Sequence, residues 1–260
     1  MTERKIDFMK TDLFHIGKFV IHGYGLMIGI GFVLALLVGE YRAKKMGMKE
    51  EALIDIAIIA GVSGFLGAKL LYIIVSFKDF IEDPIGVLGS SGFVVYGGLI
   101  AGVLCNLIYV KIKKLSFLEY FDLVMPEIAL AQGFGRIGCF LAGCCYGRET
   151  TSRFGVVFPE GGLAPAGVKL IPTQLISSAG DFLIMIVLLL YYRKNKKDGT
   201  PGNVGFLYML LYGVGRFLVE FLRNDNRGGA WMFSTSQWIS MVIVAGGIVL
   251  YLVNKKRHKR

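Results

Sequence analysis

Residues 53–77 read LIDIAIIAGVSGFLGAKLLYIIVSF, and this stretch decides the fold class because only Asp55 and Lys69 in it are charged. An α-helix rises about 1.5 Å per residue, so about 20 apolar residues cross the hydrocarbon core of a bilayer. Residues 53–77 are long enough and apolar enough to do this. We therefore predict that they form a helix that spans a membrane.

The same pattern extends over the rest of the chain. Further apolar runs lie at 19–39, 93–110, 120–142, 175–192, 204–222 and 237–253. The chain is 54% hydrophobic and 18% charged, with a mean hydropathy of +0.59, which is more apolar surface than a soluble core of this size can bury. We predict an all-α integral membrane protein with seven transmembrane helices. Residues 1–260 are expected to form a single polytopic domain, with 147–174 as an outer loop or cap.

The connections between the runs predict the orientation. Segments 41–52, 111–116, 193–203 and 254–260 hold 16 Lys and Arg in 36 residues, whereas segments 1–18, 78–92, 147–174 and 223–236 hold 10 in 75 residues. Cytoplasmic loops carry the excess of positive charge in membrane proteins, so we expect the N-terminus outside and the C-terminus in the cytoplasm. The net charge of +10 then fits basic loops against anionic lipid, and we expect membrane lipids rather than nucleic acid as partners.

Two local patterns predict how helices begin and pack. Ser116 and Glu119 fit a capping box that starts the fourth run, and Pro126 is expected to kink or restart that helix. Glycine pairs four residues apart let membrane helices approach closely. We therefore expect close helix contacts at Gly25 with Gly29 and at Gly98 with Gly102.

Three cations lie inside the apolar runs instead of in the connections: Lys69, Arg136 and Arg216. A cation in the middle of a bilayer costs at least about 2.5 kcal/mol, so each needs a partner or a purpose. The predicted orientation places all three in the outer half of the membrane, at the level of Tyr24 and Tyr96. These five side chains are expected to meet in one layer.

Helical spacing indicates which charges share a face. Arg216, Glu220 and Arg223 fall within about 60° of one another, so Glu220 can pair with either arginine. Arg136 shares its face with Cys139 and has no carboxylate there. Arg136 either pairs with Glu220 across helices or binds an anionic ligand, and a phosphate matches the forked donors of arginine.

The four cysteines are Cys105, Cys139, Cys144 and Cys145. The C-x4-C-C spacing of the last three differs from ordinary zinc and iron–sulfur motifs, so no metal site is predicted. We interpret them as small packing residues. A thiol that carries an acyl or lipid group beside Arg136 is the alternative.

Several motifs resemble those of the bacterial prolipoprotein diacylglyceryl transferases, and they follow the order of that family over nearly the whole chain. They are GRIGCFLAGCCYGR at 135–148, HGYG at 22–25, GAK at 67–69, GGLI at 97–100, PTQL at 172–175, YGxxRxxxExxR at 212–223 and QWIS at 237–240.

The resemblance implies an enzyme of the bacterial inner membrane whose active site faces the outer leaflet. It would transfer the diacylglyceryl group of phosphatidylglycerol to the lipobox cysteine of a lipoprotein precursor, releasing glycerol phosphate, without a cofactor. The family's essential residues map to Arg136, Arg216 and Tyr24, and we add Tyr96 as a catalytic candidate. The substrate-binding candidates are Lys69, Cys139, Gly147, Glu220, Arg223, Gln174 and His22.

The chain departs from the family pattern where a proton would be handled. The family commonly has His where this chain has Tyr96, Asn at the position of Cys139, a carboxylate near Cys144, and HPSQLYE where residues 171–177 read IPTQLIS. The general base and the acceptor therefore stay open. A related transferase with another acceptor, or a lipid-binding or transport protein without chemistry, is the alternative.

Overall fold

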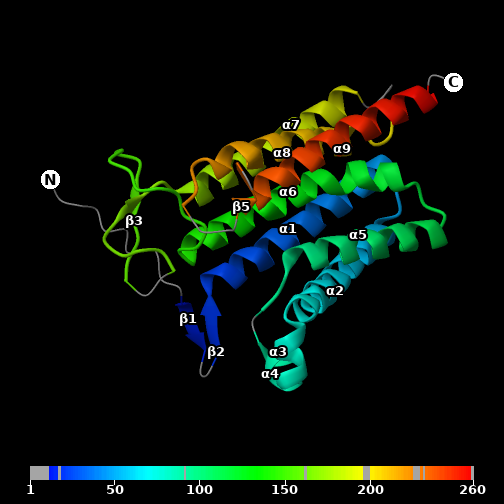
Figure 1. Ribbon diagram of the computed structural model, residues 1–260. Helices are drawn as coiled ribbons and strands as arrows, with labels where there is room; N and C mark the ends of the chain where they lie inside the picture. Colours follow the sequence, from blue (N-terminus) through cyan, green and yellow to red (C-terminus); the bar gives the residue numbers. More distant parts are fainter. Residues whose placement is uncertain are drawn as a thin grey trace. The chain divides into compact units, whose positions relative to one another are not determined.

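The computed structural model of this chain describes residues 12–16, 19–90, 92–160, 163–195, 200–224, 229–230 and 232–258 (Figure 1). Within these ranges the chain is mostly helical and forms two compact units. The first unit combines Met1–Val38 with Phe121–Arg260, and the second is Gly39–Tyr120. Each unit has its own helix packing and is described by itself.

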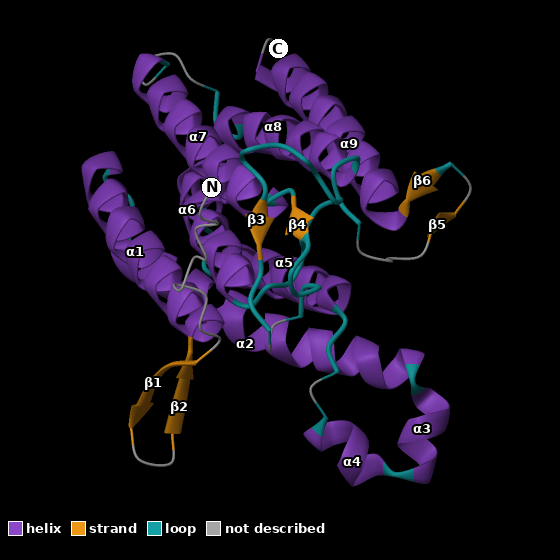
Figure 2. Cartoon of the chain, turned by 90° about the vertical axis from the view of Figure 1, so that its left-hand side faces the viewer, coloured by secondary structure: helices purple, strands orange, loops and turns teal. Residues whose placement is uncertain are grey.

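Long helices build the first unit: α1 (Gly23–Met46, as far as Val38), α6 (Phe117–Leu141, from Phe121), α7 (Thr173–Lys194), α8 (Asn203–Glu220) and α9 (Thr235–His258). Helix α8 packs against both α7 and α9, and the three lie side by side (Figures 1 and 2). A buried cluster of Ala129, Leu188, Val204 and Tyr208 joins α6, α7 and α8. These three helices therefore share one core.

The carboxylate of Asp122 on α6 fixes the start of α8. Its two oxygens accept hydrogen bonds from the backbone N–H groups of Gly202, at 2.7 Å, and Gly205, at 2.8 Å. The first N–H groups of a helix have no partner inside the helix, and the helix dipole favours a negative charge there. The ring of Phe121 packs where a Cβ of Gly205 would lie. These contacts set the position of α8 against α6.

The second unit is a helix pair, α2 (Glu50–Val75) and α5 (Val95–Ile112), joined through the short helices α3 (Phe77–Glu82) and α4 (Pro84–Gly89) (Figure 1). Glycines line the contact between α2 and α5. A Cβ added to Gly98 would lie 2.5 Å from the carbonyl oxygen of Gly64, and one added to Gly97 would collide with the backbone of Gly67.

The predicted glycine contact is thus confirmed for Gly98, and the contact at Gly102 is looser, because a Cβ added there would lie 3.8 Å from the carbonyl oxygen of Ala60. The prediction is wrong for Gly25 and Gly29, because a Cβ at either position meets no described atom within 4 Å. The four-residue spacing identifies glycine pairs on one helix face. It does not indicate whether the backbone of another helix packs against that face.

Short strands form three antiparallel pairs (Figure 2): β1 (Asp12–Ile16) with β2 (Phe19–His22), β3 (Val156–Val157) with β4 (Lys169–Leu170), and β5 (Gly229–Ala230) with β6 (Phe233–Ser234). Residues 19–22 are therefore a strand, not the start of the first helix. The β3–β4 pair belongs to 147–174, where Phe158, Ala164 and Leu170 form a buried cluster. The described residues of that segment therefore have a small core of their own.

Each of the seven predicted apolar runs coincides with one long helix. By length and composition, five of these helices are able to cross a membrane: Gly23–Met46, Glu50–Val75, Val95–Ile112, Thr173–Lys194 and Thr235–Arg257. The other two long helices, α6 and α8, contain charged residues within their apolar stretches. Helix α6 begins after Ser116 as predicted, and it continues through Pro126 instead of restarting there.

Candidate functional site

A pocket in the first unit is lined from α6, α7 and α8. Its walls include Arg136, Ser177, Asp181, Tyr212, Gly215 and Arg216, and its cavity has a volume of about 60 Å³. This is smaller than the about 300–1,000 Å³ of a site that encloses a whole small molecule. The pocket therefore places two cations and one carboxylate around a small cavity.

Arg216 is held firmly on one side of this pocket. Its Nη1 lies 2.7 Å from Oε2 of Glu220, and its Nη2 donates a hydrogen bond to Oγ of Ser236 at 3.0 Å. Glu220 also accepts a hydrogen bond from Oγ of Ser234 at 2.8 Å, and it lies 3.9 Å from Nε of Arg223. The predicted pairing of Glu220 with both arginines is confirmed.

Arg136 has a different environment. In the part of the chain that the structure describes, its guanidinium makes no ion pair or hydrogen bond with a side chain, although Asp181 and Tyr212 are its electrostatic neighbours in the pocket. Glu220 pairs with the arginines of its own segment. Arg136 and Arg216 thus come together in one pocket, and Arg136 has donors to offer a ligand.

Tyr24 belongs to the same unit as the arginines. It lies in the first turn of α1, it is partly exposed, and its backbone packs where a Cβ of Gly138 on α6 would lie. Cys139 and Arg136 are among its electrostatic neighbours. Tyr24 and Arg136 therefore belong to the same unit and interact electrostatically, whereas the layer of five side chains stays a prediction. His22 ends strand β2 just before this helix and is exposed.

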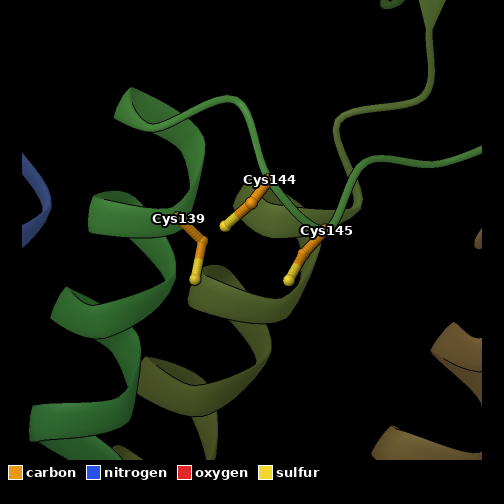
Figure 3. Close-up of side chains that lie close together, drawn as sticks. All are labelled: Cys139, Cys144 and Cys145. Carbon is orange, nitrogen blue, oxygen red and sulfur yellow. The ribbon is translucent and has the colours of Figure 1, made fainter. Parts of the chain in front are cut away.

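The cysteines after α6 converge (Figure 3). The sulfur atoms of Cys139, Cys144 and Cys145 lie within 4.8 Å of one another. Hydrogen bonds from Cys139 and Cys144, together with the guanidinium of Arg223, lower the pKa of the Cys145 thiol. The hydrogen bond with Cys139, the bond with Cys145 and burial raise the pKa of Cys144.

Gly147 and Gln174 hold the chain around the cysteines. The N–H of Gly147 donates to the carbonyl of Ile171 at 3.0 Å, and a Cβ at Gly147 would lie 2.7 Å from the carbonyl oxygen of Leu222. Gln174, which is only 1% exposed, donates from Nε2 to the carbonyl oxygen of Cys144 at 2.7 Å. Both residues lie beside the cysteines, where they position backbone.

Lys69 and Tyr96 belong to the second unit. Nζ of Lys69 donates to the carbonyl oxygen of Ser90 at 2.8 Å, to Oγ of Ser90 at 3.3 Å and to the carbonyl oxygen of Gly92 at 3.4 Å. Tyr96 lies in the first turn of α5 and is partly exposed. Their place in a layer with Arg136 stays a prediction.

Asp181 and Tyr212 line the pocket, and Ser236 binds Arg216, yet the sequence analysis named none of them as site residues. The sequence does indicate Asp181 as a functional candidate, because it is a carboxylate inside the apolar run 175–192. It was overlooked because only the cations in the runs were considered. Tyr212 and Ser236 carry no such signal.

Comparisons with known proteins show the family of this chain. The model of the prolipoprotein diacylglyceryl transferase family matches residues 11–253. A phosphatidylglycerol–prolipoprotein diacylglyceryl transferase 2 of Clostridium perfringens is 47% identical over 97% of this chain and 98% of its own length. The transferase of Clostridium tetani is 46% identical over 96% and 99%, and that of Clostridioides difficile 37% over 91% and 92%. The chain therefore belongs to the prolipoprotein diacylglyceryl transferase family.

Proposed function

We propose that this chain transfers the diacylglyceryl group of phosphatidylglycerol to the cysteine thiol of a lipoprotein precursor, the first step in lipoprotein maturation. The names of the relatives, which match it nearly end to end, support this reaction. The observation that carries the proposal is the pocket in which Arg136 and Arg216 meet from two different helices.

The chemistry of the reaction suits such a pocket. The acceptor thiol loses its proton, because the thiolate is the nucleophile. Its sulfur forms a bond to the terminal glyceryl carbon while the bond from this carbon to the phosphate oxygen breaks. Glycerol phosphate leaves with that electron pair. Fixed cations in a pocket of low dielectric stabilise the charge that grows on the leaving phosphate.

The surroundings of the two arginines assign them different parts in the proposal. Arg216 is bound to Glu220 and Ser236, so it supplies a cation of fixed position. Arg136 faces the pocket with donors that are available for the phosphate oxygens. Tyr24 lies near enough to Arg136 to contact the same substrate.

The remaining site residues have supporting parts in the proposal. Glu220 and Arg223 orient Arg216, Gln174 binds the backbone of Cys144, and Gly147 allows a close approach of the backbone at Leu222. His22 lies beside Tyr24 at the start of α1. Tyr96 and Lys69 belong to the second unit, and the proposal assigns them no contact with this pocket.

We place the protein in the bacterial inner membrane as one polytopic domain with seven transmembrane helices. The density of Lys and Arg in alternate connections supports a cytoplasmic C-terminus and an outer N-terminus. In this orientation the pocket faces the outer leaflet, and 147–174 forms an outer cap. The five helices suited to crossing a membrane support a multi-pass protein.

The test is an assay with purified protein in detergent, phosphatidylglycerol and a lipobox peptide. Mass spectrometry of the peptide is expected to show a diacylglyceryl thioether on its cysteine. Arg136→Ala and Arg216→Ala should each lower kcat/KM by about 10²–10³, the effect of removing one charge-stabilising donor. The matched control is Arg193→Ala, an exposed arginine in the last turn of α7.

Two results would contradict the proposal. The reaction is wrong if the wild-type protein leaves the peptide cysteine unmodified in the presence of phosphatidylglycerol. The mechanism is wrong if Arg136→Ala and Arg216→Ala both keep full activity. A loss of activity in Arg193→Ala as large as in these variants would mean that the effect is not specific to the pocket.

A further inference from the structure

The three thiols at the end of α6 form a cluster to which the proposed transfer chemistry assigns no chemical step, although Cys139 is one of the substrate-binding candidates. Cys139 comes from the last turns of the helix, and Cys144 and Cys145 come from the loop that follows. Figure 3 shows the three side chains directed into one small space. Their sulfur atoms all lie within 4.8 Å of one another.

The backbone accounts for this convergence. Gly143 has a φ of +67°, which ends the helix and turns the chain back. The N–H of Cys144 then donates to the carbonyl of Cys139 at 3.1 Å. Cys145 has a φ of +62°, a conformation that residues with a side chain rarely adopt. The loop therefore keeps an unfavourable backbone geometry that places the third sulfur beside the other two.

Buried side chains of α7 hold this loop in place. Thr173 and Gln174 are each 1% exposed. Oγ1 of Thr173 donates to the carbonyl oxygen of Cys145, and Nε2 of Gln174 donates to that of Cys144, both at 2.7 Å. These hydrogen bonds fix the backbone that carries two of the three thiols. The cysteine loop is thus preorganised from outside the cluster.

The distances fit one metal ion. A Zn²⁺ ion binds thiolate sulfur at about 2.3 Å, which places the sulfurs of a tetrahedral site about 3.8 Å apart. The three sulfurs need to move by only about 1 Å to reach this separation. Three thiolate donors select soft or borderline ions such as Zn²⁺, whereas Mg²⁺ and Ca²⁺ require oxygen ligands.

The charges are compatible as well. Three thiolates around Zn²⁺ carry a net charge of −1. The guanidinium of Arg223, which is 7% exposed, hydrogen-bonds the Cys145 sulfur, and Arg136 is an electrostatic neighbour of Cys139. A buried negative charge needs such a partner.

We propose that Cys139, Cys144 and Cys145 bind one Zn²⁺ ion through three thiolate ligands. The ion links the end of α6, which carries Arg136, to the loop that α7 holds. The unusual C-x4-C-C spacing hides this site in the sequence. Three protein ligands also leave a fourth coordination position for water or another small ligand.

The experiment uses the full chain, purified in detergent with an affinity tag that contains no histidine. The protein is treated with a chelator, reloaded with Zn²⁺ and dialysed, and its zinc content is measured by atomic emission. We expect one zinc ion per chain. Loading with Co²⁺ should produce the intense absorption of a cobalt–thiolate bond.

Substitutions identify the ligands. Zinc binding should be weakened by each of the variants Cys139→Ser, Cys144→Ser and Cys145→Ser. Loss of a partner that only contacts a ligand lowers metal affinity about 10–100-fold, and loss of a ligand itself should have a larger effect. The matched control is Cys105→Ser, because Cys105 is a free cysteine on α5 in the other unit. This variant should keep one zinc ion per chain.

A measurement on the wild-type protein keeps the test valid if a variant fails to fold. Alkylation of the wild-type protein, followed by mass spectrometry, should show that Zn²⁺ slows the alkylation of three cysteines. The alkylation rate of Cys105 should not change. The proposal is overturned if Cys139, Cys144 and Cys145 react equally fast with and without Zn²⁺. It is also overturned if the chelated protein contains a disulfide among them or if all three serine variants retain zinc.

Discussion

Lys69 and Arg136 are both cations on apolar helices, and their surroundings differ in kind. Lys69 on α2 donates to two backbone carbonyls and one hydroxyl in the segment that leads into α5. Its ammonium group also lies 4.9 Å from the ring centre of Phe93 and 5.2 Å from that of Tyr72. Arg136 on α6 instead lines a pocket with a second arginine.

On the proposed function, this difference separates a structural cation from a ligand-binding one. An ammonium group has three N–H donors, and the three oxygens around Lys69 match them. A cation satisfied in this way stabilises the fold and has little left for a substrate. A guanidinium that faces open space beside another cation is unfavourable until an anion binds. Position in an apolar run therefore does not distinguish the two roles, whereas hydrogen-bond partners do.

The largest expected effect is on activity, in a comparison of Arg136→Met with Lys69→Met. Both substitutions replace a cation by an apolar side chain. Arg136→Met should lower kcat/KM by about 10²–10³, because it removes stabilisation of the leaving phosphate. Lys69→Met should lose much less activity per folded molecule and instead lower the melting temperature. The measurements are steady-state kinetics and thermal unfolding of monodisperse protein.

The sequence analysis included Lys69 among the substrate-binding residues, and this pair of variants tests that prediction. An equal loss of kcat/KM in both variants, at an unchanged melting temperature, would place Lys69 in the site and break the distinction. Lys69→Arg is the conservative control, because it keeps the charge while changing the geometry of the donors.

A smaller effect, on stability, is expected from alanine substitutions at two helical glycines, one in each unit. The neighbours of these two glycines differ. Gly97→Ala places a Cβ against the backbone of Gly67 and the Cβ of Leu71. Overpacking of this kind costs about 1–3 kcal/mol. Gly29→Ala meets no described atom within 4 Å and gains helix propensity. Thermal unfolding followed by circular dichroism should therefore show a lower midpoint only for Gly97→Ala.

The glycine prediction would fail if both alanine variants unfolded at the same temperature as the wild type. In that case the backbones of α2 and α5 would have room to separate without loss of stability. A decrease in Gly29→Ala would instead indicate that α1 makes a close contact through this face.

The sequence predicted the features that depend on local pattern. The long apolar runs gave the helices, and the spacing of Arg216, Glu220 and Arg223 gave their pairing. The features it missed depend on contacts between distant segments or on backbone angles. Asp122 binds the start of α8 across 80 residues, and the positive φ of Cys145 brings the thiols together.

The site was predicted in part for the same reason. Arg136 and Arg216 are rare cations in apolar runs, and their positions in these runs predicted a similar depth in the membrane. Both line the same pocket. Asp181 was visible in the sequence but was not considered with them. The fold of 147–174 was not predictable, because its small core joins Phe158, Ala164 and Leu170 from a segment without helical or strand periodicity.

The smallest expected effect concerns the pocket carboxylate, Asp181, and its counterpart in the second unit, Asp55. Asp181 is 5% exposed and lines the pocket with Arg136 and Arg216. Asp55 accepts a hydrogen bond of 2.5 Å from Oη of Tyr109. Asp181→Asn leaves two cations without their nearby negative charge, so the lipid-free protein should be less stable and an anionic ligand should bind more tightly.

The measurement is the rise in melting temperature when phosphatidylglycerol replaces phosphatidylcholine in mixed micelles. This rise should be larger for Asp181→Asn than for the wild type, by the equivalent of about 1 kcal/mol, which is the interaction of two unit charges about 4 Å apart when water screens them. Asp55→Asn should lower the melting temperature through the lost hydrogen bond and leave the lipid-dependent rise unchanged. If both variants changed this rise equally, or if Asp181→Asn reduced it, the pocket would not be the site where the anionic headgroup binds, and the contrast between the two units would no longer hold.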